Sequence, residues 1–208
     1  MLEEVDITGD KAKEATNQLQ KSTSLKLSRN ESTGKLSAKG KAKTAADKKL
    51  MEAITDTKVV VKVNATSSNY TDKGNWFVGG AYGGSTKNAD GTVTTNQTVN
   101  PNMTAKIDNF YGAPKGVSVL HEVIESYIGG KDSPGLGAPT FADVQNKTSV
   151  GTAYESAHLK AETLDPRHVT PNISQDPTTG QVYISKYPYN PNIPPALNPE
   201  ILIDDLSK

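Results

Sequence analysis

Two residues four positions apart, His121 and Glu125, are the clearest indication of chemistry in this sequence of 208 residues. They lie in VSVLHEVIESYI (117–128), where apolar residues recur at helical spacing, so the segment is predicted to be a helix. Residues four apart on a helix share a face, and their side chains can bind one ion. Glu122 is predicted on an adjacent face. The segment therefore predicts a divalent metal site with a second carboxylate beside it.

The same arrangement occurs in the HExxH helix of zinc peptidases, where the outer residues hold the metal and the inner glutamate activates a water molecule. Glu125 replaces the second histidine of that motif. A carboxylate binds zinc at a distance similar to that of imidazole but favours harder metals, so Zn²⁺ is expected and another divalent metal is the alternative. Peptide hydrolysis with Glu122 as general base is the expected reaction.

A third metal ligand is expected from another segment, because catalytic zinc has three protein ligands and one open position. His158 is the expected ligand, since it lies in a second helical pattern, TAYESAHLKAETL (152–164), whose small alanines allow close helix packing. Glu155 and Glu162 are alternatives to it. His168 is a weaker choice, because it follows a proline in a predicted loop.

These residues also allow an interpretation without catalysis. His121 would then be a boundary residue of a partly exposed helix, Glu122 and Glu125 would be solvated, and His158 would pair with a neighbouring glutamate on the surface. The chain would be a non-enzymatic structural or interaction module of a secretion system or virion. Its histidine and glutamate cluster would hold a structural ion or none.

Composition and charge exclude several other classes of function. With 23 basic and 23 acidic residues, no net charge draws the chain to nucleic acid or an anionic membrane, and zero cysteines exclude thiolate chemistry and disulfides. Phosphodiester hydrolysis is disfavoured because no basic stripe lies near His121. No membrane span or signal peptide is recognised, so we expect a soluble protein that another polypeptide or machine must carry if it is secreted.

The strands expected to support the site form hairpins. The runs within 24–38 predict a first hairpin, KVVVKVNA (58–65) is the strongest strand, and 76–86 with 92–99 predicts a second hairpin around an Asp-Gly turn. Glycine pairs in 76–86 indicate a bulge or close approach of an extended substrate, with flexible strand ends as the alternative. The residues expected to bind substrate there are Gly79, Gly80 and Tyr82.

The remaining helical signals are less uniform. Residues 9–21 predict a peripheral helix, and TAADKKLMEAI (44–54) predicts a helix with a threonine cap. The helix at 117–128 is predicted to end at Gly129-Gly130. After a hairpin signal at 176–185, the prolines disfavour further regular structure.

The expected architecture is α+β: a mostly antiparallel sheet of hairpins with packed helices, one of them carrying the metal site. Three parts are expected along the chain. They are an N-terminal helical extension (1–23), a metallopeptidase-like catalytic domain (24–168), and a hairpin with an extended, irregular proline-rich tail (169–208).

Several segments share a pattern with a known group of domains. They are TGKLSAKG (33–40), ADKKLMEAI with VKVNATSS (46–54, 61–68), FVGGAYGG (77–84), VNPN (99–102), GVSVLHEVIESYIGG (116–130) and YESAHLKAE (154–162). Through them, roughly residues 24–162 resemble the toxin domains at the C-terminus of Rhs (YD-repeat) and related polymorphic toxins, particularly of Bacteroidetes. Members of that group include zincin-like metallopeptidases.

The resemblance implies a fold, a site and a biological role. It implies a zincin-like fold in which His121, Glu125 and His158 hold Zn²⁺ and Glu122 is the general base. It further implies an antibacterial effector that acts on a protein or peptide, is delivered into a target cell as part of a larger Rhs-type polypeptide or machine, and is neutralised by a cognate immunity protein.

Overall fold

The main sheet has four strands, in the order β1 (Val5–Thr8), β4 (Val59–Ala65), β6 (Val93–Val99) and β5 (Gly80–Lys87). It belongs to a computed structural model that describes residues 4–188 and 198–205 and confirms the α+β class. Alternate residues of β4 and β6 are buried on one face, as expected for strands with one covered side.

The direction of the strands differs from the expected arrangement within this sheet. The predicted hairpin of β5 and β6 is confirmed, but β1 and β6 both run parallel to β4. The sheet is mixed because β5 returns along the outer edge, which leaves β6 beside β4 in the parallel direction. The other described strand pairs are antiparallel, including the predicted first hairpin, β2 (Lys26–Arg29) with β3 (Leu36–Lys39).

Helix α4 (Val117–Asp132) carries the predicted metal motif and packs against β4, β5 and β6. It continues past its predicted end at Gly129-Gly130. A Cβ atom on Gly130 would lie 2.1 Å from Thr95 Cγ2, and one on Gly129 would lie 3.0 Å from the Tyr82 ring. These glycines therefore permit close contact between helix and sheet instead of ending the helix.

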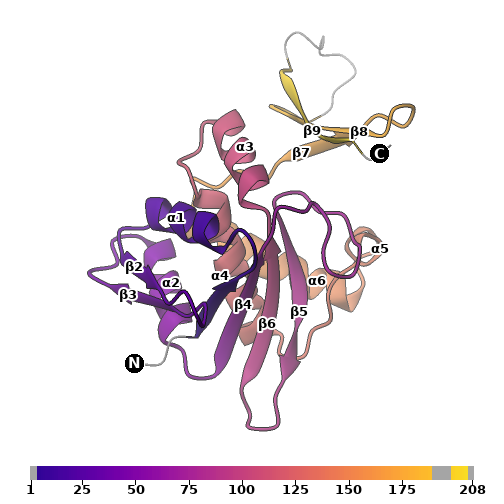
Figure 1. Cartoon of the computed structure of the whole chain (residues 1–208). Helices are drawn as coiled ribbons and strands as arrows, with labels where there is room; N and C mark the ends of the chain where they lie inside the picture. Colours follow the sequence, from indigo (N-terminus) through magenta and orange to yellow (C-terminus); the bar gives the residue numbers. More distant parts are fainter. Residues whose placement is uncertain (1–3, 189–197, 206–208) are drawn as a thin grey trace.

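Four of the other helices contact α4, and the fifth, the short helix α5 (Phe141–Gln145), packs against α6 (Ser149–Leu164) (Figure 1). Helix α2 begins with the predicted threonine cap, a capping box between Thr44 and Asp47. Helix α3 was not predicted, although Asn100 caps its start and Gly112 ends it in the left-handed conformation. These helices are α1 (Ala12–Ser22), α2 (Ala45–Thr55), α3 (Pro101–Tyr111), α5 (Phe141–Gln145) and α6 (Ser149–Leu164).

The N-terminal segment belongs to the main core, and its predicted peripheral position is wrong. Strand β1 pairs with β4, and Val5 and Ile7 are fully buried. Helix α1 buries Ala15 and Leu19 in the same core. The small apolar face of α1 is sufficient because alanine allows the helix to approach its neighbours closely.

A second, smaller sheet is formed near the C-terminus by β7 (Asn172–Gln175), β8 (Gln181–Ser185) and β9 (Glu200–Asp205). It lies apart from the main sheet, beside α3 (Figure 1), and Val182, Ile184 and Ile203 pack against α3 residues. The hairpin signal is confirmed, whereas the irregular tail is wrong for β9. Residues 189–197, the most proline-rich part of that prediction, lie outside the described residues.

None of the helices within residues 4–188 and 198–205 combines the length and apolar character needed to cross a lipid bilayer.

Candidate metal centre

Three side chains predicted to bind a metal converge between α4 and α6: His121, Glu125 and His158. His121 Nε2 lies 3.3 Å from Glu125 Oε2 and 3.1 Å from His158 Nδ1, and His158 Nδ1 lies 2.6 Å from Glu125 Oε2. One ligand atom from each residue thus lies within 4.8 Å of the others. We call these three residues the metal cluster. The structure brings His158 to the other two, as the sequence predicts.

The burial of the cluster follows from the packing of the two helices. His121 is 1% exposed and Glu125 is 2% exposed, because α4 is enclosed by the sheet and the surrounding helices. Helix α6 approaches α4 through Ala157 and Ala161, which are buried in the main core. His158, on α6, retains a side-chain exposure of 23% and is the least buried member of the cluster.

Glu125 and His158 each shift the pKa of the other toward its charged form. Burial acts to raise the pKa of the Glu125 carboxyl, but hydrogen bonds with His121 and His158 lower it below its usual value. Burial acts to lower the pKa of His158, whereas its contact with Glu125 raises it above the ordinary histidine value. Glu125 is therefore an ionised ligand, which is the form that binds a metal.

Glu122 lies beside the cluster and contacts β5 and β6. Gln97 Nε2 donates a hydrogen bond to Glu122 Oε2, and a Cβ atom on Gly80 would lie 2.0 Å from the Glu122 carboxyl carbon. Burial, followed by the negative charge of Glu125, raises the pKa of Glu122 well above its usual value. A carboxyl whose pKa is raised takes up a proton more readily than an ordinary glutamate, which suits a general base.

Two tyrosines line the same region. The Tyr82 and Tyr154 rings stack with centroids 6.2 Å apart, and Tyr154 stacks on His158 at 6.0 Å. Burial raises the pKa of Tyr154, and the negative charges of Glu125 and Glu122 raise it further. The Tyr154 phenol is therefore a neutral hydrogen-bond donor close to both carboxylates.

His168 also lies at the cluster, although the sequence made it a weak choice. Its ring stacks on His121 with centroids 3.7 Å apart and planes 7° apart. Burial lowers the pKa of His168 to about 2, with a further contribution from the neighbouring histidines, so the ring is neutral. The proline-containing loop that made His168 seem poorly aimed is fixed by tertiary contacts.

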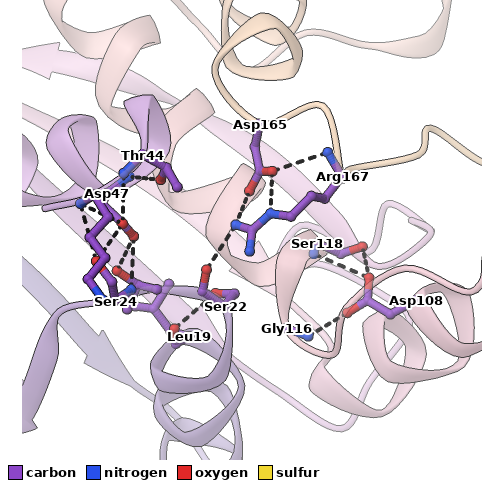
Figure 2. A network of polar contacts seen from close by, with 12 residues as sticks. Leu19, Ser22, Ser24, Thr44, Asp47, Asp108, Gly116, Ser118, Asp165 and Arg167 are labelled. Carbon is purple, nitrogen blue, oxygen red and sulfur yellow. Dashed lines mark hydrogen bonds and ion pairs between the residues drawn. The ribbon is translucent and has the colours of Figure 1, made fainter.

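Those contacts run through Arg167, which reaches the end of α1 (Figure 2). Arg167 Nη2 donates to the Ser22 carbonyl at 2.9 Å, and Arg167 Nε donates to Asp165 Oδ1 at 2.7 Å. The hydrogen bond with Asp165 raises the pKa of Arg167 by more than partial burial lowers it, so the guanidinium stays charged in this ion pair. The loop carrying His168 is thus tied to the core.

Several buried polar atoms around the cluster lack a hydrogen-bond partner among the described residues. They are Glu125 Oε1, His121 Nδ1, His168 Nδ1 and Gln97 Oε1. Of these atoms, Glu125 Oε1 belongs to a carboxylate of the metal cluster, and a buried carboxylate oxygen without a partner is a place where an ion or ordered water is expected. Two imidazoles and one ionised carboxylate are also a ligand set found in catalytic zinc sites. The residues present therefore fit a divalent metal.

The other residues considered from the sequence lie in different positions. Glu155 pairs with Lys147 at 2.5 Å and does not enter the cluster, whereas Glu162 lies 3.5 Å from His158 Nε2, outside the three ligand atoms. Gly79, with a positive φ of 77°, packs against α3, since a Cβ there would lie 3.1 Å from Ile107. Of the three predicted substrate-binding residues, Gly80 and Tyr82 adjoin the site.

Three residues at the site were not recognised from the sequence as functional. Gln97 occupies an inward position of β6, where a glutamine among valines and threonines was the available signal. Tyr154 lies one helical turn before His158 and therefore on the same face, which the sequence related only to packing. Thr170, 3.3 Å from His158 Nε2, follows a loop and carried no signal.

Comparison with known proteins does not assign the chain to a family: no family model, curated protein or solved structure matches it.

Proposed function

We propose that this protein is a metal-dependent hydrolase of the metallopeptidase type, with Zn²⁺ as its expected ion. The observation that carries the proposal is the convergence of His121, Glu125 and His158, with a partly buried glutamate, Glu122, beside them. A structural ion needs only ligands, whereas a neighbouring carboxyl with a raised pKa serves proton transfer. This favours an enzyme over a structural module.

Each side chain has a distinct role in the proposed reaction. His121, Glu125 and His158 would hold the ion, which when bound supplies a Lewis acid and lowers the pKa of water. Glu122 would take a proton from the attacking water and pass it to the leaving amine. Gln97 orients the Glu122 carboxylate through its amide hydrogen bond.

Tyr154 supports hydrolysis of a carbonyl compound in particular. Its neutral phenol lies close to Glu122 and Glu125, and a hydroxyl donor in such a position can stabilise negative charge that develops on a carbonyl oxygen. The Tyr154 phenol stays protonated at physiological pH, because burial and the two neighbouring carboxylates raise its pKa.

The edge of the main sheet supports an extended peptide as substrate. Strand β5 is the terminal strand of that sheet, and an extended chain can add to such an edge. At Ser85 the edge is already occupied, because its backbone N–H donates to the Leu136 carbonyl at 2.6 Å. The peptide would therefore lie along residues 80–83, next to Glu122.

Metal content and hydrolysis test the proposal directly. The purified protein should bind about one zinc ion per chain by elemental analysis, and Glu125→Ala should lose it. Cleavage of an unfolded protein substrate should stop with a chelator and return with added zinc. Failure to bind zinc, or cleavage that persists in Glu122→Gln, would contradict the proposal. Stoichiometric iron in place of zinc would keep the metal site but contradict the expected ion, since two histidines and a carboxylate also bind Fe²⁺.

The resemblance to Rhs-type toxin domains supports a second part of the proposal, an antibacterial effector delivered into target cells and neutralised by an immunity protein. Expression inside bacteria tests it. The wild type should arrest growth, and Glu122→Gln should not. Equal toxicity of the two proteins, or none from either, would count against an enzymatic toxin.

A further inference from the structure

The two histidines of the metal cluster differ in how their second ring nitrogen is held. Histidines that bind metals usually use that nitrogen in a hydrogen bond, which fixes the ring orientation. His158 Nε2 lies 3.3 Å from Thr170 Oγ1, which itself donates to Glu162. His121 Nδ1 is buried and has no partner among the described residues. Another contact must therefore fix the ring of His121.

The stacked ring of His168 supplies that contact. The two rings are nearly parallel, 7° apart, and their centroids are separated by 3.7 Å. At this distance the rings are in van der Waals contact, so His121 cannot rotate about its Cβ–Cγ bond without colliding with His168.

His168 can act in this way because its own position is fixed. Its backbone N–H donates to the Asp165 carbonyl at 3.1 Å, and Asp165 is held by Arg167, which also binds the Ser22 carbonyl (Figure 2). The stacking ring is thus connected to the end of α1 and not to a free loop.

The same geometry excludes His168 as a fourth ligand of the same ion. A metal bound to His121 Nε2 lies in the plane of the His121 ring, whereas an imidazole ligand must have the metal in its own plane at about 2.0–2.1 Å. Parallel rings in contact lie about 3.4 Å apart, so the ion would remain well outside the plane of His168. The role of His168 is therefore carried by its ring face and not by a nitrogen.

We infer that His168 is a positioning residue, which holds the His121 imidazole in its ligand orientation by stacking where a hydrogen bond to the second nitrogen is missing. This inference rests on the proposed metal site and adds the stacking contact that orients one of its ligands. It places His168 outside the set of residues that would hold the ion.

Substitutions at position 168 separate stacking from ligation. Phenylalanine keeps a flat ring and removes both nitrogens, whereas alanine removes the ring and leucine replaces it with a side chain of similar bulk. We expect zinc affinity, measured by competition with a chromophoric chelator, to be 10–100-fold weaker in His168→Ala and His168→Leu. His168→Phe should bind zinc nearly as well as the wild type.

A second measurement does not depend on the ion. In the metal-free protein the stacked ring should shift the His121 carbon-bound ring protons upfield in NMR spectra. His168→Phe should preserve that shift, and His168→Ala and His168→Leu should remove it. Far-ultraviolet circular dichroism shows whether each variant is folded. If His168→Ala is not folded, His168→Leu still tests the loss of the ring.

Each alternative result overturns the inference in a recognisable way. Equal zinc affinity in the wild type, His168→Ala and His168→Leu would show that stacking is not needed, with the proposed metal site intact. Equal weakening in the phenylalanine and alanine variants would show that a nitrogen of His168 is required. A wild type without zinc affinity would overturn the metal site and the inference together.

Discussion

Two groups of buried polar side chains differ in how fully their hydrogen-bonding atoms are satisfied. Asp47, Asp108 and Asp165, which we call the scaffold carboxylates, accept hydrogen bonds on both oxygens (Figure 2). The metal cluster and its neighbours leave several buried atoms without partners among the described residues. The scaffold carboxylates are therefore satisfied by the described residues, whereas the region of the metal cluster is not.

Asp47 shows what a completed site looks like. It is 1% exposed and receives bonds from Thr23, Ser24, Lys43 and Thr44. Burial acts to raise the pKa of Asp47, but these bonds lower it far below its usual value. The pKa of Glu122 is raised instead, so the two carboxyls differ in the direction of the shift, and only that of Glu122 suits the proposed proton transfer.

The largest expected effect is on catalysis, from Glu122→Gln. Loss of the proposed general base should lower kcat/KM by about 10²–10⁴-fold. The free energy of unfolding should stay the same or rise, because burial and the charge of Glu125 disfavour the ionised form of Glu122, which an amide cannot adopt. Peptide hydrolysis and urea denaturation measure the two quantities.

Glu155→Gln is the matched control, since Glu155 pairs with Lys147 away from the cluster. It should change neither quantity. A clear loss of stability in Glu122→Gln would mean that Glu122 belongs with the scaffold carboxylates.

The opposite pattern is expected for Asp47→Ala. Removing a carboxylate that accepts several hydrogen bonds and caps α2 should lower the free energy of unfolding by about 3 kcal/mol. Zinc affinity of the folded protein should be unchanged, because Asp47 contacts no member of the metal cluster. Urea denaturation of the metal-free protein and a zinc titration test this, and a matching loss of zinc affinity would remove the distinction between the two regions.

Metal should stabilise the fold through the cluster alone. Zinc at 100 times its Kd should raise the free energy of unfolding by about 2.7 kcal/mol, and a chelator should reverse this. The wild type and Asp47→Ala should gain equally, whereas Glu125→Ala should gain nothing. Denaturation with and without zinc measures the increment. A gain in Glu125→Ala would indicate a different binding site.

The smallest expected effect is the pH dependence of the scaffold. Because the pKa of Asp47 is lowered in the folded state, the unfolded chain takes up a proton first as the pH falls. The stability that Asp47 provides is present above its unfolded pKa, about 3.9, and is lost at lower pH. The difference between the wild type and Asp47→Ala should shrink by about 1 kcal/mol between pH 4 and pH 3. Denaturation curves at these pH values would show a constant difference if Asp47 were unimportant.

Local signals predicted the parts of the site that lie close together in the sequence. His121 and Glu125 share a helix face because of their spacing, and the capping box of α2 depends on residues three apart. The bulge in β5 was indicated by its glycines and occurs between Tyr82 and Ser85. These features need only the geometry of one element.

Other features depend on contacts between distant segments. Gly129 and Gly130 looked like a helix end, and only the position of Thr95 and Tyr82 shows that they allow α4 to lie close to the sheet. Strand β1 has four residues, too few for a clear pattern, and forms because β4 is available to pair with it. No local rule could supply these partners.

The sequence by itself determined that one helix presents a histidine and two glutamates, since the rotation per residue of a helix fixes which side chains share a face. It also identified His158 as a residue of the right type on a second helix. The tertiary structure decided that His158 meets His121 and Glu125, that Gln97 holds Glu122, and that His168 stacks on His121. These contacts join residues dozens of positions apart, and only the packing of α4 against the sheet and α6 sets their distances.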